Sequence, residues 1–276
     1  MKRIKTTVFI ALLLSVVLVL AGCGSTAKEQ TAYELVKSAA EKTNALDSSE
    51  MNMEINMKMS IMGMTMDLPM KYNIKTAKDG DAVNTLGTMD MSVMGESFKA
   101  EMFIDKDFIY MKEIDTDDPD SAAKVKIPVD DETAKAYNVA DMSGNMIKTL
   151  PEDILKDVEV VKSENGDRIV NVQIAEDRFN EIFKEYTDSA LSNVLSEISD
   201  NSDTEIKFSN TKVTVTVDKN GYISKYDLGF DISLKMDMQG ISMDLNATCE
   251  SFINFVDPGT KVVVEKPADL DTYEAI

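Results

Sequence analysis

The most constraining feature of this chain is a strict alternation of apolar and polar residues near its start. In the range Met51–Ile61 every odd position is apolar, and after Gly63 the apolar residues move to the even positions, as far as Ile74. Successive side chains of a β-strand point to opposite faces, so the pattern predicts two long strands with one apolar and one polar face. A two-residue turn centred on Met62 and Gly63 explains the change of parity.

This turn also fixes which residues face each other across the two strands. The apolar pairs expected in this register are Met59 with Met66, Met57 with Leu68, and Ile55 with Met70. The same register places Lys58 opposite Asp67 and Glu54 opposite Lys71, and opposite charges that face each other across strands are favourable. Since the register follows from the turn alone, the charge pairs support it independently.

Further glycine-centred turns predict similar hairpins along the chain. Turns at Gly166 and Gly221 predict two of them, and turns at Gly95 and Gly240 predict the two most like the first. The facing pairs expected around the latter two are Met91–Phe98, Asp90–Lys99, Met236–Met243, Leu234–Leu245, Lys235–Asp244 and Phe230–Cys249. Strands of about eleven residues reach roughly 36 Å, which is longer than usual, so such a sheet has to curve.

Helical segments are expected to cover the apolar face of this sheet. Thr31 can cap a helix that runs to Leu46, because Glu34 stands three residues after it. Short helical pieces are expected in the range Pro128–Lys156, and the apolar stripe of Glu176–Ile198 predicts an amphipathic helix. The predicted fold class is therefore α+β. We expect a long-stranded, strongly curved antiparallel sheet of about eleven strands, an incomplete barrel with helices on its apolar concave face.

The N-terminal residues indicate export. Three basic residues precede the apolar stretch Val8–Leu20, which is too short to cross a bilayer and is typical of a secretory signal peptide. The sequence Leu20-Ala21-Gly22-Cys23 resembles a lipobox. The resemblance implies that residues 1–22 are a signal peptide, that Cys23 carries lipid, and that residues 23–30 form a tether. We expect the protein on the extracytoplasmic face of the cell membrane, held by this N-terminal lipid anchor.

Composition narrows the possible functions. The chain carries a net charge of −20, and its signal peptide contributes only positive charges, so nucleic acid is not an expected partner. Histidine is absent, which excludes histidine-based triads and histidine-ligated zinc. We therefore expect no enzyme activity, no cofactor and no metal centre, and we expect a monomer. With Cys23 lipidated, Cys249 has no partner for a disulfide, and its place on the apolar face predicts a buried, inert thiol.

The order of these elements resembles the LolA/LppX-like lipoprotein-carrier superfamily. The likeness covers residues 31–268, expected as a single domain, and the closing segment Val262–Ala268 resembles the proline-containing ends of related lipoproteins; residues 269–276 are expected as a polar tail. The resemblance implies an apolar cavity that holds acyl chains. Candidate lining residues are Met53, Ile55, Met57, Met59, Met66, Leu68, Met70, Met91, Phe98, Phe230, Leu234, Met236, Met243 and Leu245.

The many methionines on this face allow three interpretations. They can fill an ordinary core, they can line a pocket that adapts to varied acyl chains, or their thioethers can bind Cu(I). The function expected from the second interpretation is that of a non-catalytic lipoprotein that binds a lipid or acyl chain. The alternative is a surface scaffold or sensor domain with a filled core that acts through protein partners.

Overall fold

In the computed structural model, the described residues include twelve strands, which form one sheet. The structure describes residues 31–61, 63–80, 82–93, 95–114, 123–129, 155–163, 165–177, 179–181, 204–238 and 241–275. The strands are β1 (Ser48–Ile61), β2 (Met64–Asp79), β3 (Ala82–Val93), β4 (Glu96–Ile104), β5 (Phe108–Glu113), β6 (Lys124–Pro128), β7 (Leu155–Lys162), β8 (Arg168–Ile174), β9 (Thr204–Val217), β10 (Ile223–Met238), β11 (Ile241–Phe255) and β12 (Glu274–Ala275).

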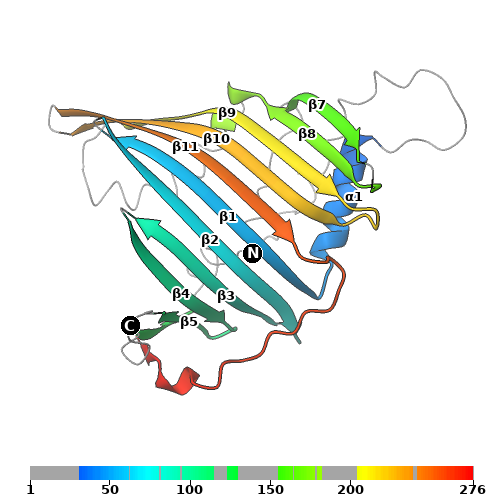
Figure 1. Cartoon of the computed structure of the whole chain (residues 1–276), viewed down its shortest axis with the longest axis vertical. Coiled ribbons are helices and arrows are strands. Elements are labelled where there is room, and N and C mark those ends of the chain that lie inside the picture. Colours follow the sequence, from blue (N-terminus) through cyan, green and yellow to red (C-terminus); the bar gives the residue numbers. More distant parts are fainter. Residues whose placement is uncertain are drawn as a thin grey trace, which may run out of the picture.

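The strand order is β12-β6-β5-β4-β3-β2-β1-β11-β10-β9-β8-β7. Neighbouring strands are antiparallel except β12, which runs parallel to β6. Two series of hairpins, β1 to β6 and β7 to β11, therefore join where β1 pairs with β11, from Met51–Phe255 to Ile61–Leu245. Figure 1 shows the long central strands side by side.

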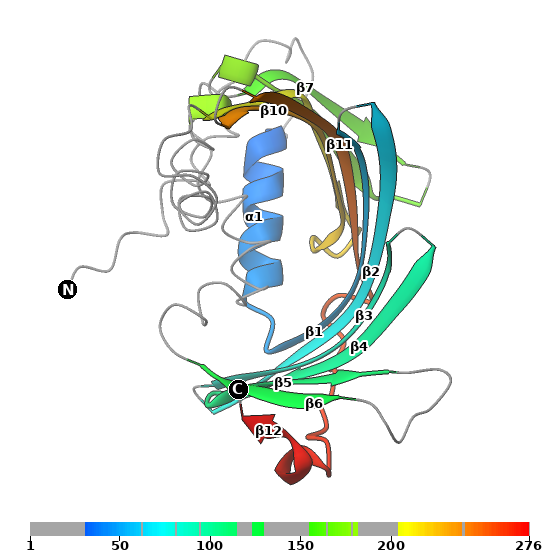
Figure 2. The same cartoon turned by 90° about the vertical axis from the view of Figure 1, so that its left-hand side faces the viewer.

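The sheet is strongly curved and open, as an incomplete barrel is. Figure 2 shows it bending around the helix α1 (Ala32–Asn44), which lies on the concave side. The described residues form twelve strands, where about eleven were expected for the chain; the short β12 had no signal in the sequence. Helix α1 lies on the concave side, and the described residues of 176–181 are helical. A cover of several helices stays a prediction, because residues 130–154 and 182–203, where the other helices were expected, lie outside the described residues.

All the hairpin registers expected from the turns are confirmed. Lys58 faces Asp67 at 3.7 Å and Asp90 faces Lys99 at 3.4 Å, and the apolar pairs of the three hairpins fall as predicted. Gly63 and Gly95 have φ angles of 82° and 89°, which suit glycine in a tight hairpin turn. The alternation in sequence therefore becomes two chemically different faces of one sheet.

Helix α1 begins as its sequence predicts and packs against the concave face. The Thr31 hydroxyl accepts from the Glu34 amide at 3.2 Å, and the Glu34 carboxylate accepts from the Thr31 amide at 3.0 Å, which is a capping box. The apolar side of α1 forms the main core together with residues from both ends of the chain. The main core includes Tyr33, Leu35, Val36, Met51, Ile74, Val170, Val215, Val217, Tyr226 and Ile253.

A second, smaller cluster lies on the opposite face of the sheet. Phe103 and Tyr110, from β4 and β5, point away from α1 and pack with Leu270 and Tyr273, and we name this the outer cluster. Residues 257–275, the C-terminal strap, carry the last two of these side chains and run outside the curved sheet (Figure 2).

Part of the strap was expected to be a polar tail. Residues 269–275 instead contain the 3-10 turn η3 (Leu270–Thr272) and the strand β12, because Leu270 and Tyr273 find apolar cover.

Candidate functional site

The predicted lining residues lie on the concave face of the sheet. Met53 and Phe230 pack against the main core, and they share this face with Met51 through the alternation of β1 and the register with β11 and β10. Most of the others are only partly buried, namely Ile55, Met57, Met59, Met66, Leu68, Met70, Met91, Phe98, Leu234 and Leu245. Met236 and Met243 pair across β10 and β11, but their side chains lie outside the described set.

No charged side chain interrupts the concave face over its four central strands. On β1, β2, β10 and β11, the described concave-facing positions level with Met51 through Met59 are apolar or carry small polar groups such as Ser251. The structure thus brings the predicted lining residues onto one continuous uncharged surface that extends beyond the main core.

Cys249 lies on the same surface and has the state expected from the sequence. It is free, 6% exposed, and faces Phe230 on β10 and Met57 on β1. Burial raises the pKa of the Cys249 thiol, and the nearby carboxylate of Glu250 raises it further. The neutral thiol is therefore favoured, and Cys249 is unsuited to act as a nucleophile.

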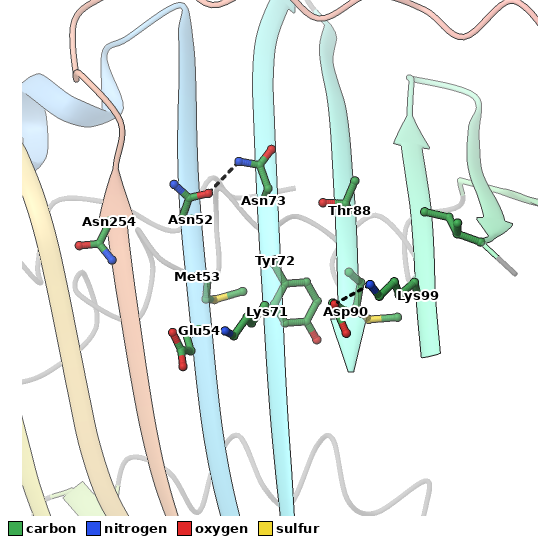
Figure 3. A pocket seen from close by; sticks show the side chains of 12 residues that line it. Asn52, Met53, Glu54, Lys71, Tyr72, Asn73, Thr88, Asp90, Lys99 and Asn254 are labelled. Carbon is green, nitrogen blue, oxygen red and sulfur yellow. Dashed lines mark hydrogen bonds and ion pairs between the residues drawn. The ribbon is translucent and has the colours of Figure 1, made fainter. Parts of the chain in front are cut away.

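The convex face carries a hollow that no sequence pattern predicted. It has a volume of about 430 Å³, and we name it the polar hollow (Figure 3). The side chains that face it come from β11, β1, β2, β3 and β4, five strands that lie side by side. Its polar lining residues are Asn52, Glu54, Lys71, Asn73, Thr88, Asp90, Lys99 and Asn254.

These polar residues form two rows across the strands. The amide row is Asn254, Asn52, Asn73 and Thr88, each directly opposite the next in the sheet register. The charge row lies two residues further along each strand and consists of Glu54, Lys71, Asp90 and Lys99. The charges alternate in sign along this row, so the polar hollow has no net charge although the chain as a whole is strongly acidic.

Within the described part of the chain, some side chains of the two rows have a hydrogen-bond or ion-pair partner and others have none. The Asn73 amide donates to the Asn52 side-chain oxygen at 2.8 Å, and Lys99 pairs with Asp90 (Figure 3). Within that same part, Lys71 lies between two carboxylates in the register yet forms no ion pair, and the side chain of Asn254 forms no hydrogen bond. Donors and acceptors therefore remain available at the polar hollow.

Sequence signals for this site existed in part. The cross-strand charges of Glu54 with Lys71 and of Asp90 with Lys99 followed from the hairpin turns. These two charge pairs form one row only because β2 pairs with β3, and the amide row forms only because β1 pairs with β11. Neither pairing has a local sequence signal.

Two features of the described residues bear on membranes and metals. Among the helices that the structure describes, none has the length and apolarity needed to cross a membrane. Within the same residues, no three carboxylate, histidine or cysteine side chains gather as a metal site would require. Residues 1–22, the expected signal peptide, and Cys23 fall outside the described residues.

The described chain is thus an open, curved antiparallel sheet with a helix in its concavity. Residues 31–266 match a protein-family model described as a family of unknown function, DUF6612, and the chain belongs to this family. No curated protein matches it. A solved structure, a DUF1329 family protein from Desulfovibrio piger, is similar over 86% of this chain and 93% of that one, with 11% identity and a TM-score of 0.25. A TM-score this low supports no conclusion, and membership of the LolA/LppX-like superfamily stays a prediction.

Proposed function

We propose that this protein is a non-catalytic, lipid-anchored lipoprotein that binds a lipid or the acyl chain of a lipoprotein against the concave face of its sheet. The single observation that supports this function is the uncharged surface from Met53 to Met59 and across β2, β10 and β11, on which the side chains of β1 and β2 are partly rather than fully buried. The resemblance of the element order to LolA/LppX-like carriers supports the same proposal.

Burial of apolar area supplies the binding energy in this proposal. Removing apolar surface from water contributes about 25 cal/mol per Å², and it needs no directional partner. Methionine side chains are flexible and polarizable, so they can repack around acyl chains of different shape. A ligand held in this way is recognised by its hydrocarbon part, and its headgroup is expected to matter less.

A second candidate function rests on the same partial burial. If the methionine side chains close over one another, the concave face is a filled core, and the protein is a surface scaffold or sensor that acts through protein partners. The two candidates differ in whether hydrocarbon can enter, and this difference is directly measurable.

Lipid uptake by the protein purified without detergent tests the proposal. We expect native mass spectrometry to show a lipid adduct, and we expect a fluorescent fatty acid to bind the delipidated protein. The double substitution Met57→Gln with Met59→Gln should weaken uptake about tenfold or more, since it places two amides on the apolar face. The matched control is Asn56→Gln, on the same strand but on the polar face, and it should leave uptake unchanged.

The result that contradicts lipid binding is a ligand-free mass together with no uptake of the fatty acid by the unaltered protein. The anchor is tested separately with Cys23→Ser. We expect this variant to lose metabolic labelling by an alkyne fatty acid and to leave the membrane fraction. Retention of the label at another residue would contradict the assignment of Cys23.

A further inference from the structure

We propose that the polar hollow on the convex face is a second binding site, which takes an uncharged oligosaccharide. This site does not rest on the proposed lipid function, because the polar side chains of its two rows point to the side of the sheet opposite the proposed lipid surface. The inference rests on the geometry of the two rows, on their balance of charge and on the groups that they leave unpartnered.

The shape of the site favours an extended ligand. The amide row and the charge row cross neighbouring strands, and strands in a sheet are about 4.8 Å apart, so a polar group recurs at that interval along each row. The hollow holds about 430 Å³, which lies in the size range of small-molecule sites. Ile114, the residue that follows β5, also lines the hollow, and its amide donates to the Lys99 carbonyl at 2.8 Å.

One lysine of the charge row, Lys71, has no ion pair in the described part of the chain. Elsewhere on the same face, Lys58 pairs with Asp67 at 3.7 Å and Lys75 pairs with Glu50 at 3.6 Å. Lys71 has Glu54 on one side and Asp90 on the other, but its ammonium group lies within 4 Å of no carboxylate in the described part of the chain. Within the charge row, Lys99 and Asp90 pair at 3.4 Å, whereas the ammonium group of Lys71 stays available to a ligand.

The charge balance selects the class of ligand. Glu54 and Asp90 offset Lys71 and Lys99, so the hollow offers neither a cluster of carboxylates for a cation nor an excess of lysine for an anion. The net charge of −20 repels anions further. What the two rows offer is a mixture of donors and acceptors, with amides at Asn254, Asn52 and Asn73. Sugar hydroxyl groups both donate and accept, so an uncharged oligosaccharide fits this mixture.

Titration of the protein with chitotetraose, an uncharged tetrasaccharide of N-acetylglucosamine, tests the inference. We expect saturable binding by calorimetry or ligand-observed NMR. Asn254→Ala and Lys71→Met should each weaken binding about fivefold or more, since each removes donors from the hollow. Lys58→Ala is the matched control: it lies on the same strand face outside the hollow, and its affinity for the sugar should equal that of the unaltered protein.

Three results would overturn the inference. The first is no binding of chitotetraose by the unaltered protein. The second is binding that Asn254→Ala and Lys71→Met leave unchanged while both variants keep the circular dichroism of the native fold. The third is binding of a zwitterionic tripeptide or of oligogalacturonate as tight as that of chitotetraose, which would show that the site does not select an uncharged sugar. Fatty-acid uptake by the same variants should stay normal, so failure here is distinguishable from failure of the lipid proposal.

Discussion

The main core and the outer cluster stabilise different parts of one sheet from opposite sides. The main core lies on the concave face and holds α1 against strands from both series of hairpins. The outer cluster lies on the convex face and, among the residues that the structure describes, has four buried members, Phe103, Tyr110, Leu270 and Tyr273. An open sheet has no second sheet to cover it, so each part of it depends on whichever segment the chain can bring there.

The two regions are connected by a short chain of contacts at the start of the strap. The ammonium group of Lys42, in α1, lies 4.2 Å from the centre of the Tyr222 ring and donates to the Asn220 carbonyl at 2.5 Å. Gly259 packs against the same ring, and a Cβ added to Gly259 would lie 2.9 Å from a ring carbon of Tyr222. The strap is thus held at the helix end by this ring and at the far end by the outer cluster.

Removing a large side chain from the main core should have the largest effect on stability. Tyr33 is 0% exposed, and Tyr33→Ala is expected to lower the free energy of unfolding by about 3–5 kcal/mol, as for other large aromatic truncations. Urea unfolding followed by circular dichroism measures the change. Ser38→Ala, on the exposed side of the same helix, is the control and should change stability by less than about 0.5 kcal/mol. Equal effects of the two substitutions would contradict the placement of α1.

Truncation in the outer cluster should have a smaller and more local effect. Tyr273 packs edge-on against Tyr110 at 5.5 Å, and Tyr273→Ala is expected to cost about 2–3 kcal/mol because a small cluster at the surface can partly close the gap. Hydrogen exchange should accelerate in β5 and β6 and stay unchanged in β9 and β10. Tyr273→Phe keeps the ring and should behave as the unaltered protein. Uniform acceleration across the sheet would show that the two regions are one cooperative unit.

Adding a side chain at Gly259 should weaken the contact between the strap and Tyr222 and lower the stability of the protein. Its φ is +92°, and Gly259→Ala combines backbone strain with the clash against Tyr222, for an expected loss of about 1–2 kcal/mol. Gly80→Ala separates the two causes, since Gly80 has a φ of +63° but open space around it. Thermal unfolding should show a larger loss for Gly259→Ala than for Gly80→Ala. A loss no larger than that of Gly80→Ala would mean that the Tyr222 contact contributes nothing.

The smallest effect is expected at the ion pair that holds the strap to β6. The Lys124 ammonium donates to Asp269 at 2.8 Å, and this hydrogen bond lowers the pKa of the Asp269 carboxyl. A lowered pKa in the folded state adds stability above the usual pKa of the carboxyl, and this stability is lost as the pH falls through the folded-state value. Because the pair is partly exposed, Asp269→Asn should cost no more than about 1 kcal/mol at pH 7.

Unfolding at two pH values checks this prediction. The difference between Asp269→Asn and the unaltered protein should be present at pH 7 and should shrink as the solution is acidified below about pH 4. The stability difference between Lys124→Met and the unaltered protein should likewise be present at pH 7 and shrink on acidification. A difference that is constant across this range would mean that the carboxylate charge does not stabilise the strap.

Local features of the fold could be predicted from the sequence, and long-range ones could not. The register of β1 with β2 follows from Gly63 and from the alternation around it, and the start of α1 follows from Thr31 and Glu34. The apolar concave surface follows from the same alternation. These features depend on residues close together in the chain, whose turn chemistry and side-chain period leave few options.

The features that the sequence did not reveal depend on distant segments. Nothing local indicates that β1 pairs with β11, and the amide row from Asn254 to Thr88 exists only because of that pairing and of the pairing between β2 and β3. The strap was expected to end in a polar tail because Leu270 and Tyr273 stand among polar residues. Their burial requires Phe103 and Tyr110, more than a hundred residues earlier in the chain, to present an apolar patch.

The pairing of β1 with β11 also sets the order in which the sheet can be completed. Synthesis proceeds from the N-terminus, so β1 and β2 can form a hairpin long before Leu245–Phe255 exist. Until that last long strand emerges, one edge of β1 has no neighbour, and unpaired edges of long, apolar strands invite aggregation. Contacts between segments so far apart are slow to form. A chain of this design benefits from being kept unfolded, or kept covered by a helper, until its final strand has been made.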